Sequence, residues 1–305
     1  MRTKIAVEKI GAFTGHKDCL YSLEKAPEEQ TFFSSGSDGL VAKWSLQKPD
    51  EGTLVAKIPN TVYAMCSLPE KRELVVGQNF EGLHVISLED NTEKRTLKLK
   101  DKAIFDIKYH DDKLYVALGD GHLMVIDYEG MNVLQDIQLS TKNLRCLAIH
   151  PVQGVVLVGG SDHTIRVVDL DSLVVRQELN AHERSVFSLS FTPDYRYLLS
   201  GGMDAHMHIW DAENNFAHHQ DIVAHMYTIN DIAFRADGRY FATCSKDKSV
   251  KVWDAKEFRL LKVIDRARNA GHGTSVNKLI WLDDNTLASC SDDRTVSVWK
   301  LTFES

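Results

Sequence analysis

The chain has 305 residues, and 43 acidic against 36 basic side chains give it a formal net charge of −7. This balance argues against binding that depends on neutralising phosphates or anionic lipids, so we expect neither nucleic acid nor a membrane surface as a partner. Hydrophobic residues make up 43% and charged residues 26%, which are ordinary values for a folded globular protein.

The first ten residues do not form a secretory signal, because charged residues interrupt the apolar ones and no continuous apolar core follows. No later stretch approaches the roughly 18 apolar residues that a membrane-spanning helix needs. The five cysteines include no C-x-x-C pair and no zinc-type spacing. Free thiols in a reducing compartment fit this pattern, so we expect a cytoplasmic protein.

A turn motif recurs along the chain, in which an Asp lies six residues before a Trp. It occurs at Asp38 and Trp44, Asp204 and Trp210, Asp247 and Trp253, and Asp293 and Trp299. Weaker copies keep the spacing at Asp120 and Asp162, and a seventh copy near Phe80 has lost both markers. The Trp-equivalent positions are 44, 86, 126, 168, 210, 253 and 299, at intervals of 40 to 46 residues. Seven such units fill the chain, so we expect one domain over residues 1–305.

Each unit is predicted to contain four short alternating strands joined by turn residues. In the unit that begins at His225, the strands are expected at 228–234, 240–245, 249–254 and 260–264. Four strands at this period favour a β-propeller blade and exclude helix-pair solenoids. A lone blade cannot bury both of its faces, so closure into a ring must supply the burial.

A Gly-His or Ala-His pair precedes four of these turns by 21 or 22 residues, at His16, His182, His225 and His272. With this motif the chain resembles the WD-repeat (tryptophan–aspartate) propeller family over essentially its whole length. The resemblance implies an all-β fold, a seven-bladed β-propeller of four-stranded antiparallel blades. It also implies that the N-terminal strand, at about 4–10, joins the last blade and closes the ring.

The resemblance further implies a buried hydrogen-bond relay, in which Trp donates to Ser or Thr, the hydroxyl contacts His, and His donates to the turn Asp. The four sets are His16, Ser34, Asp38, Trp44; His182, Ser200, Asp204, Trp210; His225, Thr243, Asp247, Trp253; and His272, Ser289, Asp293, Trp299. Units two to four lack parts of the set, so we expect apolar packing to hold those blades.

Ser, His and Asp are also the parts of a nucleophilic triad, which would need one exposed set beside an oxyanion hole. Four equivalent sets at fixed spacing favour a structural role, and neither a G-x-S-x-G elbow nor a P-loop is present. We therefore expect no catalytic residues, no cofactor and no enzyme activity.

Five histidines fall between positions 206 and 225. His206 and His208 alternate along one strand face and could approach a metal together, whereas His218 and His219 point to opposite faces. No Cys or carboxylate completes a convincing set in the sequence. Solvated strand histidines are the favoured interpretation over a weak metal site, so we expect no metal.

Partners of this family commonly dock on the face formed by the loops that enter each innermost strand and by the turns that carry the repeat Asp. The fifth residue after the repeat His and the residue before the Asp are expected to point there. Candidate partner-binding residues are Tyr21, Tyr63, Phe105, Arg145, Phe187, Met203, Asn230, Lys246 and Asn277. Aromatic and Arg side chains are typical of interface hot spots, although the rings could instead pack between blades.

The predicted function is therefore a non-catalytic protein-interaction scaffold that binds a protein or peptide, as a monomeric propeller within a larger complex. The alternative is an enzyme, or a small-ligand or metal binder, that uses the central channel, since propellers host unrelated functions. Converging carboxylates in the channel would favour that alternative. The longest interval also contains an insertion at 265–271, which is expected to be a loop able to clasp an acidic partner or simply to be solvated.

Overall fold

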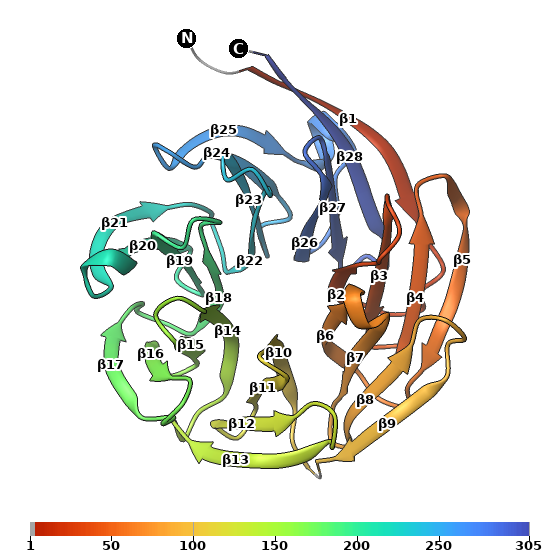
Figure 1. The fold of residues 1–305 in the computed structure, drawn as a ribbon. Coiled ribbons are helices and arrows are strands. Elements are labelled where there is room, and N and C mark those ends of the chain that lie inside the picture. The colour runs from red at the N-terminus through yellow and green to blue at the C-terminus, as the bar shows by residue number, and fades with distance from the viewer. Residues whose placement is uncertain (1–3, 100, 305) are drawn as a thin grey trace.

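The structure, a computed structural model, describes residues 4–99 and 101–304. Within these residues, seven four-stranded antiparallel sheets stand around a common axis (Figure 1). The fold is all-β and is a seven-bladed β-propeller, as the sequence predicts. In each sheet the strands follow chain order from the axis outward, except in the last, where the N-terminal strand is outermost.

The first four blades use consecutive strands. Blade one contains β2 (Leu20–Lys25), β3 (Thr31–Gly36), β4 (Leu40–Ser45) and β5 (Lys48–Lys57); blade two contains β6 (Val62–Leu68), β7 (Glu73–Gln78), β8 (Gly82–Ser87) and β9 (Glu93–Lys98). Blade three contains β10 (Ile104–His110), β11 (Lys113–Leu118), β12 (His122–Asp127) and β13 (Asn132–Gln138); blade four contains β14 (Leu144–His150), β15 (Val155–Gly160), β16 (Thr164–Asp169) and β17 (Val175–Asn180).

The remaining blades complete the ring. Blade five contains β18 (Val186–Phe191), β19 (Tyr197–Gly202), β20 (His206–Asp211) and β21 (Ala217–Val223); blade six contains β22 (Ile229–Phe234), β23 (Tyr240–Ser245), β24 (Val250–Asp254) and β25 (Arg259–Ile264). Blade seven contains β26 (Val276–Asp283), β27 (Thr286–Ser291), β28 (Val296–Glu304) and β1 (Lys4–Phe13). Three single turns of helix interrupt the described strands: η1 (Pro69–Lys71), η2 (Ala212–Asn214) and α1 (Arg266–Asn269).

Burial decreases from the second strand of each blade to the fourth. All six residues of β7, β15 and β27 are buried, because blades cover both faces of these strands. The outermost strand β13 is exposed at six of its seven positions. Stacking of the blades therefore supplies the core, which explains why the second strands are buried along nearly their whole length instead of at alternate positions.

One position in the second strand of every blade holds a small residue, and the next blade packs closely against it. The residues are Ser35, Gly77, Ala117, Gly159, Gly201, Cys244 and Cys290. A Cβ atom added to Gly77 would lie 2.8 Å from Cγ2 of Ile104 in blade three, and one added to Gly201 would lie 2.7 Å from Cγ2 of Ile229 in blade six. The small side chain lets adjacent blades approach at native packing density.

The two ends of the chain meet in blade seven. β1 pairs antiparallel with β28 from Lys4 opposite Glu304 to Phe13 opposite Val296. Figure 1 shows the two strands side by side. Ile5 and Phe13 are buried along this strand. The ring is thus closed by backbone hydrogen bonds between the N-terminal strand and the last blade, as predicted.

Candidate functional site

A β-bulge recurs at the same point of every innermost strand. The register against the second strand shifts at Tyr21, Tyr63, Phe105, Arg145, Phe187, Asn230 and Asn277. A bulged residue is left out of the ladder, and its side chain is re-aimed. All seven side chains line the mouth of the central channel. We call these seven residues the collar, and the face that bears it the top face.

Five collar residues form a continuous band of stacked side chains over blades one to five. The ring centroids of Tyr21 and Tyr63 are 4.7 Å apart, and those of Tyr63 and Phe105 are 5.5 Å apart. The Arg145 guanidinium carbon lies 4.6 Å from the Phe105 centroid and 4.9 Å from that of Phe187. All five are half-buried, so each ring keeps part of its surface open to solvent. The side chains support one another and present a pre-organised surface.

The other two collar residues join neighbouring blades. Asn230 donates from Nδ2 to the Val276 carbonyl at 2.8 Å, and Asn277 donates to the Leu20 carbonyl at 2.7 Å. Their amides are therefore engaged in blade-to-blade hydrogen bonds. The remaining sequence candidates, Met203 and Lys246, are exposed at turn tips outside the channel wall, so the structure does not bring them together with the collar.

Sequence reasoning missed three exposed apolar side chains on the same face. Phe80 occupies the turn position of the missing Asp in blade two and is 56% exposed. Met226 and Tyr227 follow the repeat His225 and are 80% and 58% exposed. With Met203 they extend the apolar surface beyond the collar. The signal was present in the sequence, because large apolar residues stand where the other units carry polar ones.

Charged side chains line the channel below the collar. They are Glu24, Asp106, Lys108, Asp231 and Lys278, and the open pocket that they line together with the collar has a volume of about 280 Å³. The sequence interpretation did not include them. They lie six or eight residues after the position of the repeat His, inside otherwise apolar innermost strands, and that spacing was a usable signal.

Two of these carboxylates bind the backbone of the next blade. Asp106 Oδ2 accepts from the Leu147 amide at 2.8 Å, and Asp231 Oδ2 accepts from the Leu279 amide at 3.0 Å. Lys278 also donates to Asp231 at 3.0 Å. These carboxylates are satisfied by the fold itself, whereas the side-chain carboxylate of Glu24 has no hydrogen-bond partner among residues 4–99 and 101–304.

The electrostatics of the channel set Glu24 apart. Desolvation by the surrounding strands raises its pKa to about 7, although Lys108 and Lys278 oppose the rise. Asp106 raises the pKa of Lys108. Burial disfavours the charged form of Lys278, but Asp231 and Asp106 outweigh that effect and raise its pKa. The ammonium groups therefore stay charged, while Glu24 exchanges a proton near neutral pH.

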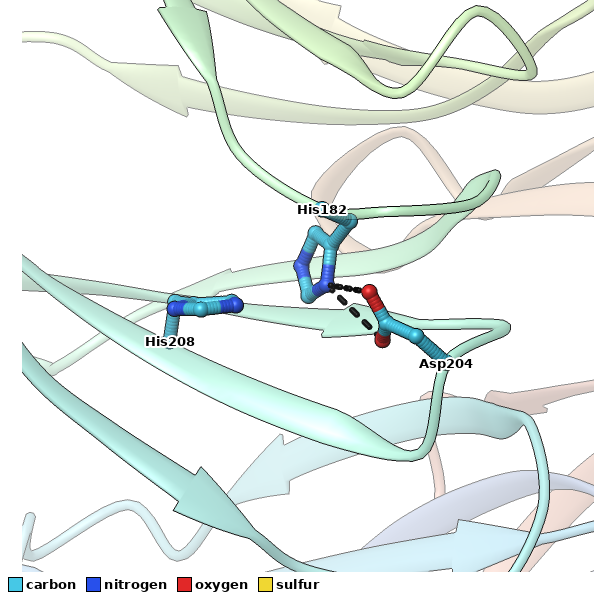
Figure 2. A group of neighbouring side chains, drawn as sticks. All are labelled: His182, Asp204 and His208. Atoms are coloured by element: carbon cyan, nitrogen blue, oxygen red, sulfur yellow. Dashed lines mark hydrogen bonds and ion pairs between the residues drawn. The ribbon is translucent and has the colours of Figure 1, made fainter.

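Three of the expected relays are complete. In blade one, Trp44 Nε1 donates to Ser34 Oγ at 2.8 Å, and Ser34 contacts His16 Nε2 at 2.7 Å. His16 Nδ1 lies 3.0 Å from Asp38. Blades five and six repeat the arrangement. In blade five the Trp–Ser, Ser–His and His–Asp distances are 3.0, 2.9 and 3.1 Å. In blade six the Trp–Thr, Thr–His and His–Asp distances are 2.9, 2.7 and 2.9 Å. Figure 2 shows the His182–Asp204 contact of blade five.

The relay of blade seven departs from the expectation. His272 contacts Ser289 at 2.9 Å and Asp293 at 2.8 Å, but Trp299 Nε1 donates to the Asn269 carbonyl at 3.2 Å and not to Ser289. The cause is the insertion at 265–271, which forms the helical turn α1 instead of a loop. The end of α1 brings a free carbonyl to the indole, and Lys9 of β1 donates to the next carbonyl, that of Ala270.

Apolar side chains take the relay positions in blades two and three. In blade two, Ile58, Val76 and Ile86 are buried in one hydrophobic cluster. Val116 and Ile126 do the same in blade three. Blade four keeps a polar substitute, in which Ser140 and Arg166 both donate to Asp162 at 2.6 Å. Apolar packing therefore replaces the relay in blades two and three, as expected, whereas blade four has an ion pair and a hydroxyl contact in its place.

The histidine-rich stretch is arranged differently from the sequence interpretation. Asp221 of β21 lies directly opposite His208 of β20, so a carboxylate does join the histidines. A bulge at Ile209 and Trp210 shifts the register, which sets His218 opposite Trp210 and on the same face. The sequence could not show this, because a one-residue shift exchanges the faces of His218 and His219.

Two comparisons bear on identity. The model of the WD domain, G-beta repeat family matches residues 7–45, 132–169, 173–211, 217–254 and 265–300, which is more than half of the chain. No curated protein matches the chain significantly. The described residues also contain no helix of the length and apolarity that crossing a membrane requires.

Proposed function

Because this chain belongs to the WD domain, G-beta repeat family, we propose that it is a non-catalytic scaffold that binds a peptide or partner protein on its top face. Propellers of this family are commonly protein-interaction scaffolds. The collar is the observation that carries the proposal. Its five stacked aromatic and Arg side chains are half-buried, mutually supported and placed at the centre of one face.

Interface hot spots have this composition and position: aromatic and Arg anchors at the centre of the contact. Fixed rings bury large apolar area while losing little conformational entropy. The exposed side chains of Phe80, Met203, Met226 and Tyr227 add apolar area on the same face. A partner segment that crosses the collar would contact both groups.

The channel supports a second candidate, a small ligand bound below the collar. Charged groups converge there, and Glu24 has no hydrogen-bond partner among the described side chains. The volume of the channel pocket, about 280 Å³, lies just below the roughly 300–1,000 Å³ that is usual for small-molecule sites. One inserted side chain of a partner matches that volume better, so we favour the scaffold.

The test is affinity capture from native cells followed by mass spectrometry, with the double variant Tyr63→Ala, Phe187→Ala. Each hot-spot truncation should cost about 2 kcal/mol or more of binding free energy, so the variant should lose the partner that the unmodified chain retains. The matched control is Val152→Ser with Val174→Ser, because these exposed apolar residues lie in the turns at the opposite end of the strands.

Circular dichroism and thermal melting would confirm that both variants are folded. Retention of the same partner by the collar variant, or its loss in the control, would place the interface elsewhere. Binding of the purified partner would then be measured directly with each variant.

A further inference from the structure

The outer half of blade five gathers metal-binding side chains that the proposed scaffold function does not use. We propose that His206, His208 and Asp221 form a binding site for a zinc ion on the outer strand pair of this blade. Zinc is the divalent ion that best combines imidazole and carboxylate ligands in a site of low coordination number. The site lies away from the collar, so this inference stands independently of the proposed function.

The backbone brings the three ligands to one face. His206 and His208 are two residues apart on β20, so their side chains project from the same side of the sheet. Asp221 of β21 is the cross-strand partner of His208 and therefore shares that side. Strand pairing fixes all three positions without help from a loop, which is the rigid support that a metal site needs.

The distances between ligand atoms suit a single ion. One ligand atom from each residue lies within 4.8 Å of those of the other two. His206 Nδ1 is 2.8 Å and His208 Nδ1 is 3.8 Å from Asp221 Oδ1. Zinc–ligand bonds of about 2.0–2.2 Å at tetrahedral angles separate neighbouring ligands by roughly 3.3–3.5 Å. Small side-chain rotations would bring the observed separations to these values.

A third imidazole, that of His218, stands beside the three proposed ligands. His218 Nε2 is 3.2 Å from His208 Nδ1, and its ring packs against Trp210 with centroids 5.4 Å apart. Two imidazole nitrogens at this distance either share a proton or face a common ion.

The ligand atoms of His182, Asp204 and His208 also lie within 4.8 Å of one another, but the fold already uses two of these residues. His182 Nδ1 contacts Asp204 and its Nε2 contacts Ser200, so neither ring nitrogen is free. Figure 2 shows His182 turned toward Asp204, with the His208 ring to one side. A metal there would have to break the relay, whereas the side chains of His206 and Asp221 hydrogen-bond to each other and, among the described residues, to no other side chain.

Blade three supplies a natural comparison. His122 and Asp136 occupy the positions of His206 and Asp221 and are 2.7 Å apart. The position of His208 is taken by Met124, which pairs opposite Asp136. A thioether is a soft ligand that zinc seldom uses in such sites. Blade three therefore has the same carboxylate–imidazole pair without the second imidazole, and it should not hold the ion.

A bound ion would stabilise the outermost strand of blade five. β21 is the outermost strand, with β20 as its only partner in the sheet, and no residue of it is fully buried. Zinc held by two ligands from β20 and one from β21 would cross-link this strand pair. Binding should therefore raise the melting temperature, because the ion binds the folded chain and not the unfolded one.

The experiment uses the untagged full-length chain, stripped with a chelator and kept reduced. Co²⁺ is titrated while its visible absorption is recorded, and Zn²⁺ is then titrated by calorimetry. We expect one equivalent of each ion per chain. Loss of an outer-shell partner alone typically weakens metal binding about 10–100-fold, so His206→Gln and Asp221→Asn should each weaken it at least about tenfold.

The matched control is His122→Gln, which should bind zinc as tightly as the unmodified chain. His206 and Asp221 are both partly exposed, so their isosteric variants should fold, and circular dichroism verifies this. Absence of a saturable equivalent would overturn the proposal, and so would equal affinity in the His206, Asp221 and His122 variants. A Co²⁺ spectrum with intense thiolate charge-transfer bands would also overturn it, because the ion would then be bound by cysteine.

Discussion

Glu24 shows how a single residue in the channel links the scaffold to pH. It lies among Asp106, Lys108, Asp231 and Lys278, and desolvation raises its pKa to about 7. The usual carboxyl pKa, about 4.3 in an unfolded chain, lies well below this value. Between these two values the folded chain binds a proton that the unfolded chain does not. The stabilising contribution of Glu24 is therefore complete at acid pH and is lost as pH rises to 7.

The first prediction follows from this loss of stability as pH rises. Glu24→Gln should raise the free energy of unfolding by about 1–2 kcal/mol at pH 8, a value reduced from the full shift because channel water screens the charge. The gain should shrink as pH falls from 7 toward 4.5. Denaturant unfolding at several pH values measures it, with exposed Glu51→Gln as control. A gain that is independent of pH would contradict the assignment.

Some residues could be located from the sequence and others could not. The collar positions follow from counting five residues after the repeat His, because the bulge occurs at the same point in all seven innermost strands. The partner of Trp299 could not be predicted, since it depends on how residues 265–271 fold into α1. The Asp221–His208 pairing was also hidden, because it depends on a register shift that periodicity does not reveal.

At the scale of the strand, the second strands determine how closely the blades pack. Their small residues lie where the next innermost strand approaches, and Gly201 faces both Ser188 of its own blade and Ile229 of blade six. Strand number and order were predictable from the spacing of turns and apolar runs. The need for a small residue at this one position was not, since it depends on the distance between sheets.

The second prediction concerns this contact. A Cβ at Gly201 would lie 2.5 Å from Ser188 Oγ and 2.7 Å from Ile229 Cγ2, so Gly201→Val should lower the free energy of unfolding by about 1–3 kcal/mol. Denaturant unfolding is the measurement. The control is Gln135→Val on exposed β13, which should change the free energy of unfolding by less than about 0.5 kcal/mol. Equal stability of the two variants would be inconsistent with tight packing of blades five and six.

For the whole molecule, closure of the ring depends on β1. Without this strand, β28 would become an unpaired edge and the cluster that contains Ile5, Trp299 and Leu301 would open to solvent. Asn277 and Leu20 make a second connection across the same junction. Each blade packs against two neighbours, so an opening at this point should weaken the entire circle.

The third prediction is that deleting residues 1–10 lowers the melting temperature of the whole protein by roughly 5 °C or more, in a single transition. Differential scanning calorimetry measures it. Ala6→Asp is the control, because Ala6 is exposed on the same strand whereas Ile5 is buried. A truncated chain that melts at the original temperature would refute closure by β1.

The pairing of β1 with β28 also constrains how the protein is made. β1 is translated before every other strand of the ring, whereas its partner β28 is translated after them. Blades one to six can assemble in order during synthesis, each from contiguous chain, while β1 remains without its neighbour until the end. The circle therefore cannot close until β28 has been synthesised, and an apolar strand must stay unaggregated while all of the intervening blades are being translated.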